Sequence, residues 1–275
     1  MTVKRTFYES IKTELLNRLE LINFGEMKVM DYATILIDRS HKGIGILTLN
    51  RPDKRNAVSI QMRREISDCL KEWKDDPAIR ILILTGAGST FTAGFDLSEF
   101  NKPGLLHELY QTSSEYHRHV WYFPKPTIAA INGPSLAGGF DLAKLCDFRI
   151  CTPEARFGHP EIKFGAPTLF TPLKWIVGAG LARDLCLSGR IIDANEAYRI
   201  GLANELVDTN KLMERALEIA GRIMEAPQEA LEQTKRFFID NADLGFEESF
   251  SIEHDKGFQE FLLKRAAAAL QQEKV

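Results

Sequence analysis

The sequence contains few cysteines, and none of them lies in a pattern that would hold a metal. A chain of 275 residues has only Cys69, Cys146, Cys151 and Cys186. They form no Cys-x-x-Cys pair and lack the spacing of combined cysteine and histidine ligands, so we expect no metal site. Four cysteines in a chain of this length are typical of reduced, mostly buried thiols, which favours a cytoplasmic location.

Long apolar runs and an excess of charge are also missing. No run approaches the roughly 20 residues needed to span a bilayer. The N-terminus lacks the apolar centre of a signal peptide, and Glu9, Glu14 and Glu20 argue against an acid-poor transit peptide. The net charge of -3 gives no overall attraction to nucleic acid or to an anionic membrane. The sequence therefore predicts neither as a partner, although a local basic site for an anionic cofactor remains compatible with it.

Apolar residues are plentiful, at 44% of the chain, which is enough to bury a large core. Short apolar runs that are typical of strands buried on both faces alternate with amphipathic helical patterns. This alternation predicts an α/β unit. The expected buried strands span residues 79–85, 127–131 and 148–151, and the expected helices span 60–73 and about 105–123.

Helical patterns also open and close the chain. Residues 8–24 have the apolar spacing of an amphipathic helix outside the main unit. Three further helices are expected at 211–224, 228–240 and about 246–271. We therefore expect three parts, which are a helical extension (1–30), a core (31–208) and a helical C-terminal region (209–275).

Two segments rich in small residues follow expected buried strands. They are residues 91–97, after the strand at 79–85, and residues 132–141, after the strand at 127–131. At a strand-to-helix junction the first backbone N–H groups have no partner, and small residues let a ligand atom approach them. Two such junctions that meet would form an oxyanion hole from two main-chain donors. The alternative is that the glycines only permit tight turns.

Carboxylates follow these junctions. Asp141 lies in the helix that Gly138 and Gly139 begin, and Glu161 follows a proline turn. Carboxylates on separate elements suit acid–base chemistry if they converge. The sequence leaves open that Asp141 is only an acid at a helix N-terminus and Glu161 only a surface carboxylate. It also leaves open whether His159 orients Glu161 or merely packs in the turn.

The segment from Tyr32 to about Asp208 resembles the enoyl-CoA hydratase/isomerase (crotonase) family throughout. The tail from Ser251 to Arg265 resembles the C-terminal helix of that family. The resemblance implies an α/β fold, a crotonase-like spiral of ββα units with a helical C-terminal region, in trimers or hexamers built as dimers of trimers. It rests on Leu49-Asn50-Arg51-Pro52 with Asn56-Ala57, Ala93-Gly94-Phe95-Asp96-Leu97, Pro126 through Asp147, Phe157-Gly158-His159-Pro160-Glu161 and Leu187-Ser188-Gly189.

The resemblance also implies roles for single residues. The backbone N–H groups of Phe95 and Gly138 match the oxyanion-hole donors for the thioester oxygen. Asp141 and Glu161 take the places of the two catalytic glutamates of the hydratases, the first being one methylene shorter. The residues implied to contact coenzyme A are Arg55, Ala57 and Ala93 in the core, and Phe261 and Lys264 in the tail, in some relatives from a neighbouring subunit.

One segment departs from the family pattern. Hydratases carry a glycine-rich turn after the second glutamate, whereas this chain has bulky Leu169 and Phe170 where the acyl pocket is expected. We therefore expect a branched, cyclic or otherwise non-standard acyl group. Residues 162–183 contain no Asp or Glu, which argues against relatives that use an acid there, the chlorobenzoyl-CoA dehalogenases and dienoyl-CoA isomerases.

The leading interpretation is an enzyme that adds water to a 2-enoyl-CoA through an oxyanion-stabilised enolate. It needs no permanently bound cofactor, because the coenzyme A thioester is the substrate. A double-bond isomerase that uses one carboxylate, and a hydrolase of a β-dicarbonyl or cyclic acyl-CoA, remain as alternatives. From another class, a thioester-binding, scaffold or RNA-binding protein of the same fold remains, although both carboxylates favour catalysis. Of the other polar residues, His117 and His119 are expected to lie at the surface or to pack, with the alternative that one of them lines the acyl pocket, and Lys235 is expected to be solvated.

Overall fold

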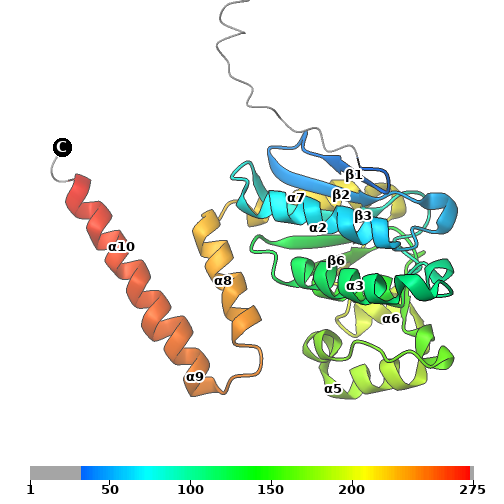
Figure 1. Cartoon of the computed structure of the whole chain (residues 1–275). Helices are drawn as coiled ribbons and strands as arrows, with labels where there is room; N and C mark the ends of the chain where they lie inside the picture. Colours follow the sequence, from blue (N-terminus) through cyan, green and yellow to red (C-terminus); the bar gives the residue numbers. More distant parts are fainter. Residues whose placement is uncertain (1–31, 273–275) are drawn as a thin grey trace, which may run out of the picture. The chain divides into compact units, whose positions relative to one another are not determined.

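The longest apolar runs form the centre of a six-stranded sheet in the computed structural model, which describes residues 32–272 (Figure 1). The helix expected within residues 1–30 lies outside the described residues. β1 and β2 form an antiparallel hairpin, and the other neighbours pair in parallel. The spatial order is β1 (Ile35–Asp38), β2 (Gly43–Leu49), β3 (Ile79–Gly86), β4 (Thr127–Ile131), β6 (Phe148–Cys151) and β9 (Glu205–Leu206).

Helices cover both faces of this sheet. Strand side chains alternate between the two faces of a sheet. Ile46, with its paired residues Ile83 and Ile128, packs with α7 (Leu212–Ile223) on one face. Gly45 lies on the other face, toward α2 (Ile60–Asp75). A Cβ at Gly45 would lie 2.5 Å from Trp73 of α2, so only glycine lets that tryptophan reach the sheet. The unbroken apolar runs of β3 and β4 are thus explained by burial on both sides.

A second, three-stranded sheet lies beside the first and is not evident from the sequence. It consists of β5 (Ser135–Leu136), β7 (Arg156–Gly158) and β8 (Ile191–Asp193), in that order. Strands of two or three residues are too short to show a periodic pattern. This sheet matters for the site because β5 leads directly into α4 (Gly138–Leu145), and β7 leads into the 3-10 turn Pro160–Phe164.

The remaining core helices are α3 (Leu106–Trp121), which packs on α2, then α5 (Thr171–Ser188) and α6 (Ala194–Arg199). Gly178 has φ +79° inside α5 and breaks its helical geometry. Short 3-10 turns complete the core at Pro52–Lys54, Leu97–Glu99, Pro103–Leu105 and Thr209–Lys211.

The C-terminal region is helical as expected. It comprises α8 (Gln228–Asp240), α9 (Phe246–Phe250), a π-helical segment (Ser251–Lys256) and α10 (Gly257–Gln272), drawn from orange to red in Figure 1. The expectation that Lys235 is solvated is wrong. Its side chain is buried, and its ammonium group lies 2.8 Å from Asp147 and 2.9 Å from the Lys125 carbonyl oxygen, which ties α8 to the core.

The four cysteines lie buried and unpaired. Burial raises the pKa of the Cys146 and Cys151 thiols to about 12, so both remain protonated and unreactive at neutral pH. Within residues 32–272, no helix is both long and apolar enough to cross a bilayer.

Candidate active site

The two small-residue junctions lie against each other. Thr92 and Ser135 form a parallel bridge, in which the Leu136 N–H donates to the Thr92 carbonyl oxygen at 3.1 Å. A Cβ at Gly139 would lie 2.6 Å from that same oxygen, and one at Gly94, which has φ +93°, would lie 2.8 Å from the Leu136 carbonyl oxygen. The glycines therefore do more than permit turns, because they let the two junctions touch.

This contact brings the Phe95 and Gly138 backbones together. A Cβ at Gly138 would lie 2.9 Å from the Phe95 ring. Phe95 and Val58 form a parallel bridge that uses the residues on either side of Phe95. The Val58 N–H donates to the Gly94 carbonyl oxygen, and the Asp96 N–H donates to the Val58 carbonyl oxygen. None of the hydrogen bonds found in residues 32–272 uses the Phe95 or Gly138 N–H. Both groups are thus available to an outside acceptor.

The turn into α4 carries backbone strain at the same place. Ala137, immediately before the helix, has φ +52° and ψ -128°, which a residue with a side chain rarely adopts. Its N–H donates to the Gly158 carbonyl oxygen at 3.0 Å, which fixes the turn to β7. Strain of this kind persists where the surroundings hold it, and it is common at functional sites.

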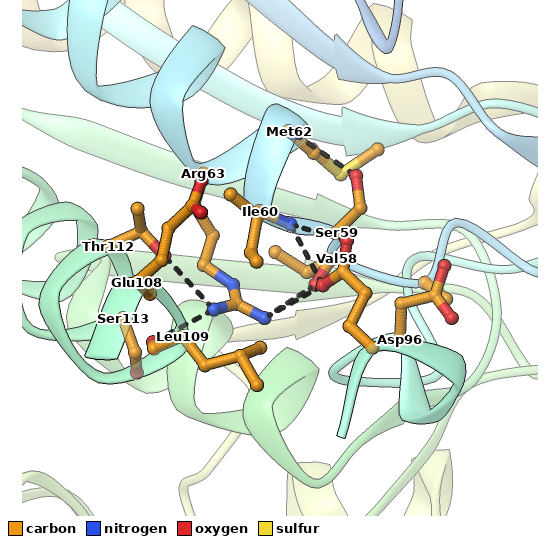
Figure 2. Close-up of polar contacts among 12 residues, drawn as sticks. Val58, Ser59, Ile60, Met62, Arg63, Asp96, Glu108, Leu109, Thr112 and Ser113 are labelled. Carbon is orange, nitrogen blue, oxygen red and sulfur yellow. Dashed lines mark hydrogen bonds and ion pairs between the residues drawn. The ribbon is translucent and has the colours of Figure 1, made fainter. Parts of the chain in front are cut away.

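A buried arginine of α2 lies beside Phe95, and Figure 2 shows its polar contacts with Val58, Leu109 and Thr112. Arg63 is fully buried and donates to the carbonyl oxygens of Leu109 (3.0 Å) and Val58 (3.2 Å). Its guanidinium carbon lies 4.4 Å from the centre of the Phe95 ring, a cation–π distance. Burial lowers the Arg63 pKa. The sequence did not single out Arg63, because one basic residue on an amphipathic helix gives no signal.

The two candidate carboxylates converge on one imidazole. The Glu161 Oε1 atom lies 2.7 Å from Nδ1 of His159, and the Asp141 Oδ1 atom lies 3.9 Å from Nε2 of the same ring. Glu161 is therefore no isolated surface carboxylate, and His159 contacts it directly. The other oxygen, Oε2, is buried and has no hydrogen-bond partner among the described residues. An unpaired buried oxygen destabilises the folded protein unless a substrate or a water molecule donates a hydrogen bond to it.

Lys144 is a second residue of this site that sequence reasoning missed. It lies one turn after Asp141 on α4, and its side chain is fully buried. Its ammonium nitrogen is 2.9 Å from Asp141 Oδ1, 2.8 Å from His159 Nε2 and 2.6 Å from the Leu169 carbonyl oxygen. The spacing Asp141 to Lys144 (i, i+3) in an otherwise apolar helix was the available signal.

A cavity of about 600 Å³ opens beside Asp141. Phe95, Leu169 and the stacked pair Trp121 and Trp175 are among its lining residues, whereas Gly138, Glu161 and Phe170 are not. Of the two residues proposed for the acyl pocket, the structure thus brings Leu169 to the cavity and leaves Phe170 outside its lining.

His117 also lines the cavity. Its Nδ1 atom lies 2.7 Å from the Ser113 carbonyl oxygen and therefore carries the proton. Burial lowers the His117 pKa, which keeps the ring neutral. His117 thus lies at the cavity, as the alternative expectation allowed, and it also packs, since its ring lies 4.2 Å from that of Tyr116 and 6.0 Å from that of Phe95.

The loop proposed to bind coenzyme A adjoins the first junction. The Ala93 N–H donates to the Arg55 carbonyl oxygen at 3.0 Å, and the Ala57 carbonyl oxygen accepts from Arg51 at 2.6 Å. Arg51 also pairs with Asp96 at 2.9 Å. Arg55, Ala57 and Ala93 are therefore grouped beside Phe95, and Arg55 leaves its side chain exposed.

The tail candidates are placed differently. Lys264 on α10 forms an ion pair with Glu229 of α8, and the ring of Phe261 lies 6.1 Å from that of Phe258 on the same helix. Both side chains are exposed. In the structure of one chain, these contacts lie within the C-terminal helices and do not involve the residues around Phe95. No group of three or more potential metal ligands occurs in the described part of the chain.

The chain is similar to known proteins over most of its length. The family model of enoyl-CoA hydratase/isomerase matches residues 39–267. The crotonyl-CoA hydratase of Syntrophomonas wolfei is 34% identical over 256 residues, which cover 86% of this chain and 98% of that protein. The short-chain-enoyl-CoA hydratase of Clostridium acetobutylicum is 34% identical, with 82% and 93% covered. The crystal structure of an enoyl-CoA hydratase from Bacillus anthracis superposes with a TM-score of 0.80 at 29% identity, covering 88% and 96%.

Proposed function

Because the chain belongs to the enoyl-CoA hydratase/isomerase family, we propose that it adds water across the double bond of a 2-enoyl-CoA, with Asp141 and Glu161 as its catalytic carboxylates. The expected family and crotonase fold are confirmed by the comparisons. One observation carries the proposal for the site. Both carboxylates face the same buried imidazole, beside two touching strand-to-helix junctions.

The proposed reaction balances as follows. The water oxygen bonds to the β-carbon, and the electron pair of the double bond moves through the α-carbon to the thioester oxygen. The Phe95 and Gly138 N–H groups hold that negative charge. One water proton passes to Glu161, which delivers a proton to the α-carbon as the enolate collapses. Asp141 accepts a hydrogen bond from the attacking water, and the net change is the addition of one water molecule.

The acyl group is proposed to be bulkier than crotonyl, or to be branched or cyclic. Support comes from the cavity beside Asp141, which is large for a four-carbon chain and is lined by Trp121, Trp175 and Leu169. Mass analysis of a panel of linear, branched and aromatic enoyl-CoAs after incubation tests both parts. We expect a gain of one water, fastest for a non-linear acyl group. No water gain on any thioester would refute the proposed activity.

An isomerase is the second candidate, and one observation favours it. Asp141 is a short carboxylate whose Oδ1 atom forms an ion pair with Lys144 at 2.9 Å, whereas the Glu161 Oε2 atom has neither an ion pair nor a hydrogen bond among the described residues. The substitution Asp141→Asn separates the two functions. For a two-carboxylate hydratase we expect turnover to fall about 100-fold or more, because the amide no longer provides two acceptors for the water. A one-acid isomerase would keep nearly full turnover in this variant and lose it in Glu161→Gln.

The assembly is proposed to be a trimer or hexamer in which α10 reaches a neighbouring subunit. An exposed row of stacked rings supports such a contact, since an apolar surface of this kind is typical of interfaces. Ring centres along the row are 4.6 to 6.1 Å apart. The row consists of Phe246, Phe250, His254, Phe258 and Phe261.

Removal of residues 251–275 should reduce the particle mass measured by light scattering to that of smaller assemblies. It should also raise the KM for acyl-CoA about 10-fold or more, because Phe261 and Lys264 are proposed to contact coenzyme A. Lys264→Ala should raise KM without dissociating the assembly. Lys256→Ala is the matched control and should change neither, since Lys256 is an exposed lysine of the π-helical segment that precedes α10. Full-size assemblies with the original KM after truncation would contradict this assignment.

A further inference from the structure

Lys144 lies at a buried position, where a charged side chain is normally unfavourable. Every residue of α4 is buried, and the Lys144 side chain has no exposed surface. An ammonium group taken out of water is stabilised only if charges and acceptors surround it. The groups around this one are a carboxylate, an imidazole and a carbonyl oxygen, and the first two belong to the candidate active site.

These contacts form a continuous polar chain between the two carboxylates. Asp141 Oδ1 and His159 Nε2 are 3.9 Å apart, too far for a hydrogen bond, and the Lys144 ammonium lies within 2.9 Å of both. The contact with Asp141 is an ion pair that is not aligned as a hydrogen bond, since Oδ1 has no hydrogen-bond donor among the described residues. On the far side of the ring, Nδ1 lies 2.7 Å from Glu161 Oε1.

The direction of the hydrogen bonds follows from the chemistry of each group. A lysine ammonium only donates, so His159 Nε2 accepts from it. A neutral imidazole that accepts at Nε2 carries its proton on Nδ1 and donates it to Glu161 Oε1. The ring is held in this position by Phe140, whose centre lies 4.8 Å away. Glu161 is thereby fixed through one oxygen, while Oε2 remains unpaired.

We propose that Lys144 is a positioning residue that sets different tasks for the two carboxylates, an inference that rests on the proposed hydration. The ammonium forms an ion pair with Asp141, so that Asp141 serves as an acceptor that holds the water. Through His159, the same ammonium orients Glu161 and leaves Oε2 as the atom that carries the proton. The third contact, with the Leu169 carbonyl oxygen, joins this chain to the cavity wall.

Two substitutions separate this role from simple packing. Lys144→Met keeps much of the volume but has no donor, whereas Lys144→Gln keeps an N–H₂ group that can donate to His159 or to Leu169. We expect kcat to fall about 100-fold in the methionine variant and about 10-fold in the glutamine variant, with the KM for acyl-CoA within about 2-fold of the original. A packing role predicts the opposite order, because methionine buries no unpaired polar group.

Lys125→Met is the matched control. Lys125 is also buried, and its ammonium group donates at 2.6 Å to the carbonyl oxygens of Trp73 and Asp76, which belong to no part of the site. It should cost stability while leaving kcat unchanged. If the Lys144 variants fail to fold, His159→Leu breaks the same chain at its next link and should lower kcat at least 10-fold without changing KM.

The outcomes distinguish the two levels of the proposal. A wild-type protein that hydrates no enoyl-CoA would refute the proposed function. A wild-type protein that does hydrate one, together with Lys144→Met at or above the kcat of Lys144→Gln, would overturn only the role of Lys144. Unchanged kcat in His159→Leu would overturn it as well. If both residues act in one chain, the double variant Lys144→Gln, His159→Leu should lose little beyond His159→Leu alone.

Discussion

Glu161→Gln should lower kcat by roughly 10³-fold, within the range that general acid–base groups contribute. The amide cannot take a proton from water at neutral pH, so no proton is available for the α-carbon. The change is nearly isosteric, and the His159 Nδ1–H can still donate to the remaining side-chain oxygen, as it does to Glu161 Oε1 at 2.7 Å. Steady-state kinetics with the best acyl-CoA substrate measure kcat, and calorimetry measures the affinity for coenzyme A.

Binding should be unaffected in this variant, because neither the loop with Arg55 and Ala57 nor α10 is changed. Glu154→Gln provides the matched control, since Glu154 is exposed and its carboxylate accepts a hydrogen bond from the Thr209 hydroxyl at 2.7 Å. That variant should keep the original kcat. A Glu161→Gln protein with at least a third of the original kcat would remove Glu161 from the proposed chemistry.

Gly138→Pro should lower kcat about 100- to 1,000-fold relative to Gly138→Ala, because proline lacks the N–H that is proposed to bind the thioester oxygen. Removing one such donor costs about 3 to 4 kcal/mol in comparable sites. Proline is tolerated at the first position of a helix, which Gly138 occupies in α4, so the helix itself is not expected to break.

Gly138→Ala is the control that isolates the donor. Both variants add a Cβ that would lie 2.9 Å from the Phe95 ring, so both require the same adjustment of that side chain. Only proline removes the N–H. Circular dichroism verifies that each variant folds, and kcat on one acyl-CoA gives the comparison. Equal kcat values for the two variants would mean that the Gly138 N–H does not take part in catalysis.

The sequence predicted those parts of the fold that depend on long, local patterns. The buried strands β3 and β4 have unbroken apolar runs, and α8 has a regular helical pattern after Pro227, so their positions were predicted to within about one residue. The strands of the second sheet are two or three residues long and depend on pairing between distant segments, such as Ser135 with Phe157. No local pattern records such pairing.

The candidate site divides in the same way. The junctions around Phe95 and Gly138 and the two carboxylates were found because each has a recognisable neighbourhood in the sequence. Lys144 was missed and Lys235 was judged wrongly, since whether a lysine is buried is decided by what surrounds it in space. The partners of Lys144 are His159 and Leu169, which lie 15 and 25 positions away. Only the fold brings them together.

The central claim is that water is added to the substrate, and isotopic labelling measures this directly. The protein is incubated with a 2-enoyl-CoA in H₂¹⁸O and, separately, in D₂O, and the product is analysed by mass spectrometry. We predict one ¹⁸O atom at the β-carbon in the first experiment and one carbon-bound deuterium, at the α-carbon, in the second. Deuterium uptake without ¹⁸O incorporation would contradict hydration and identify an isomerase that uses Glu161 alone.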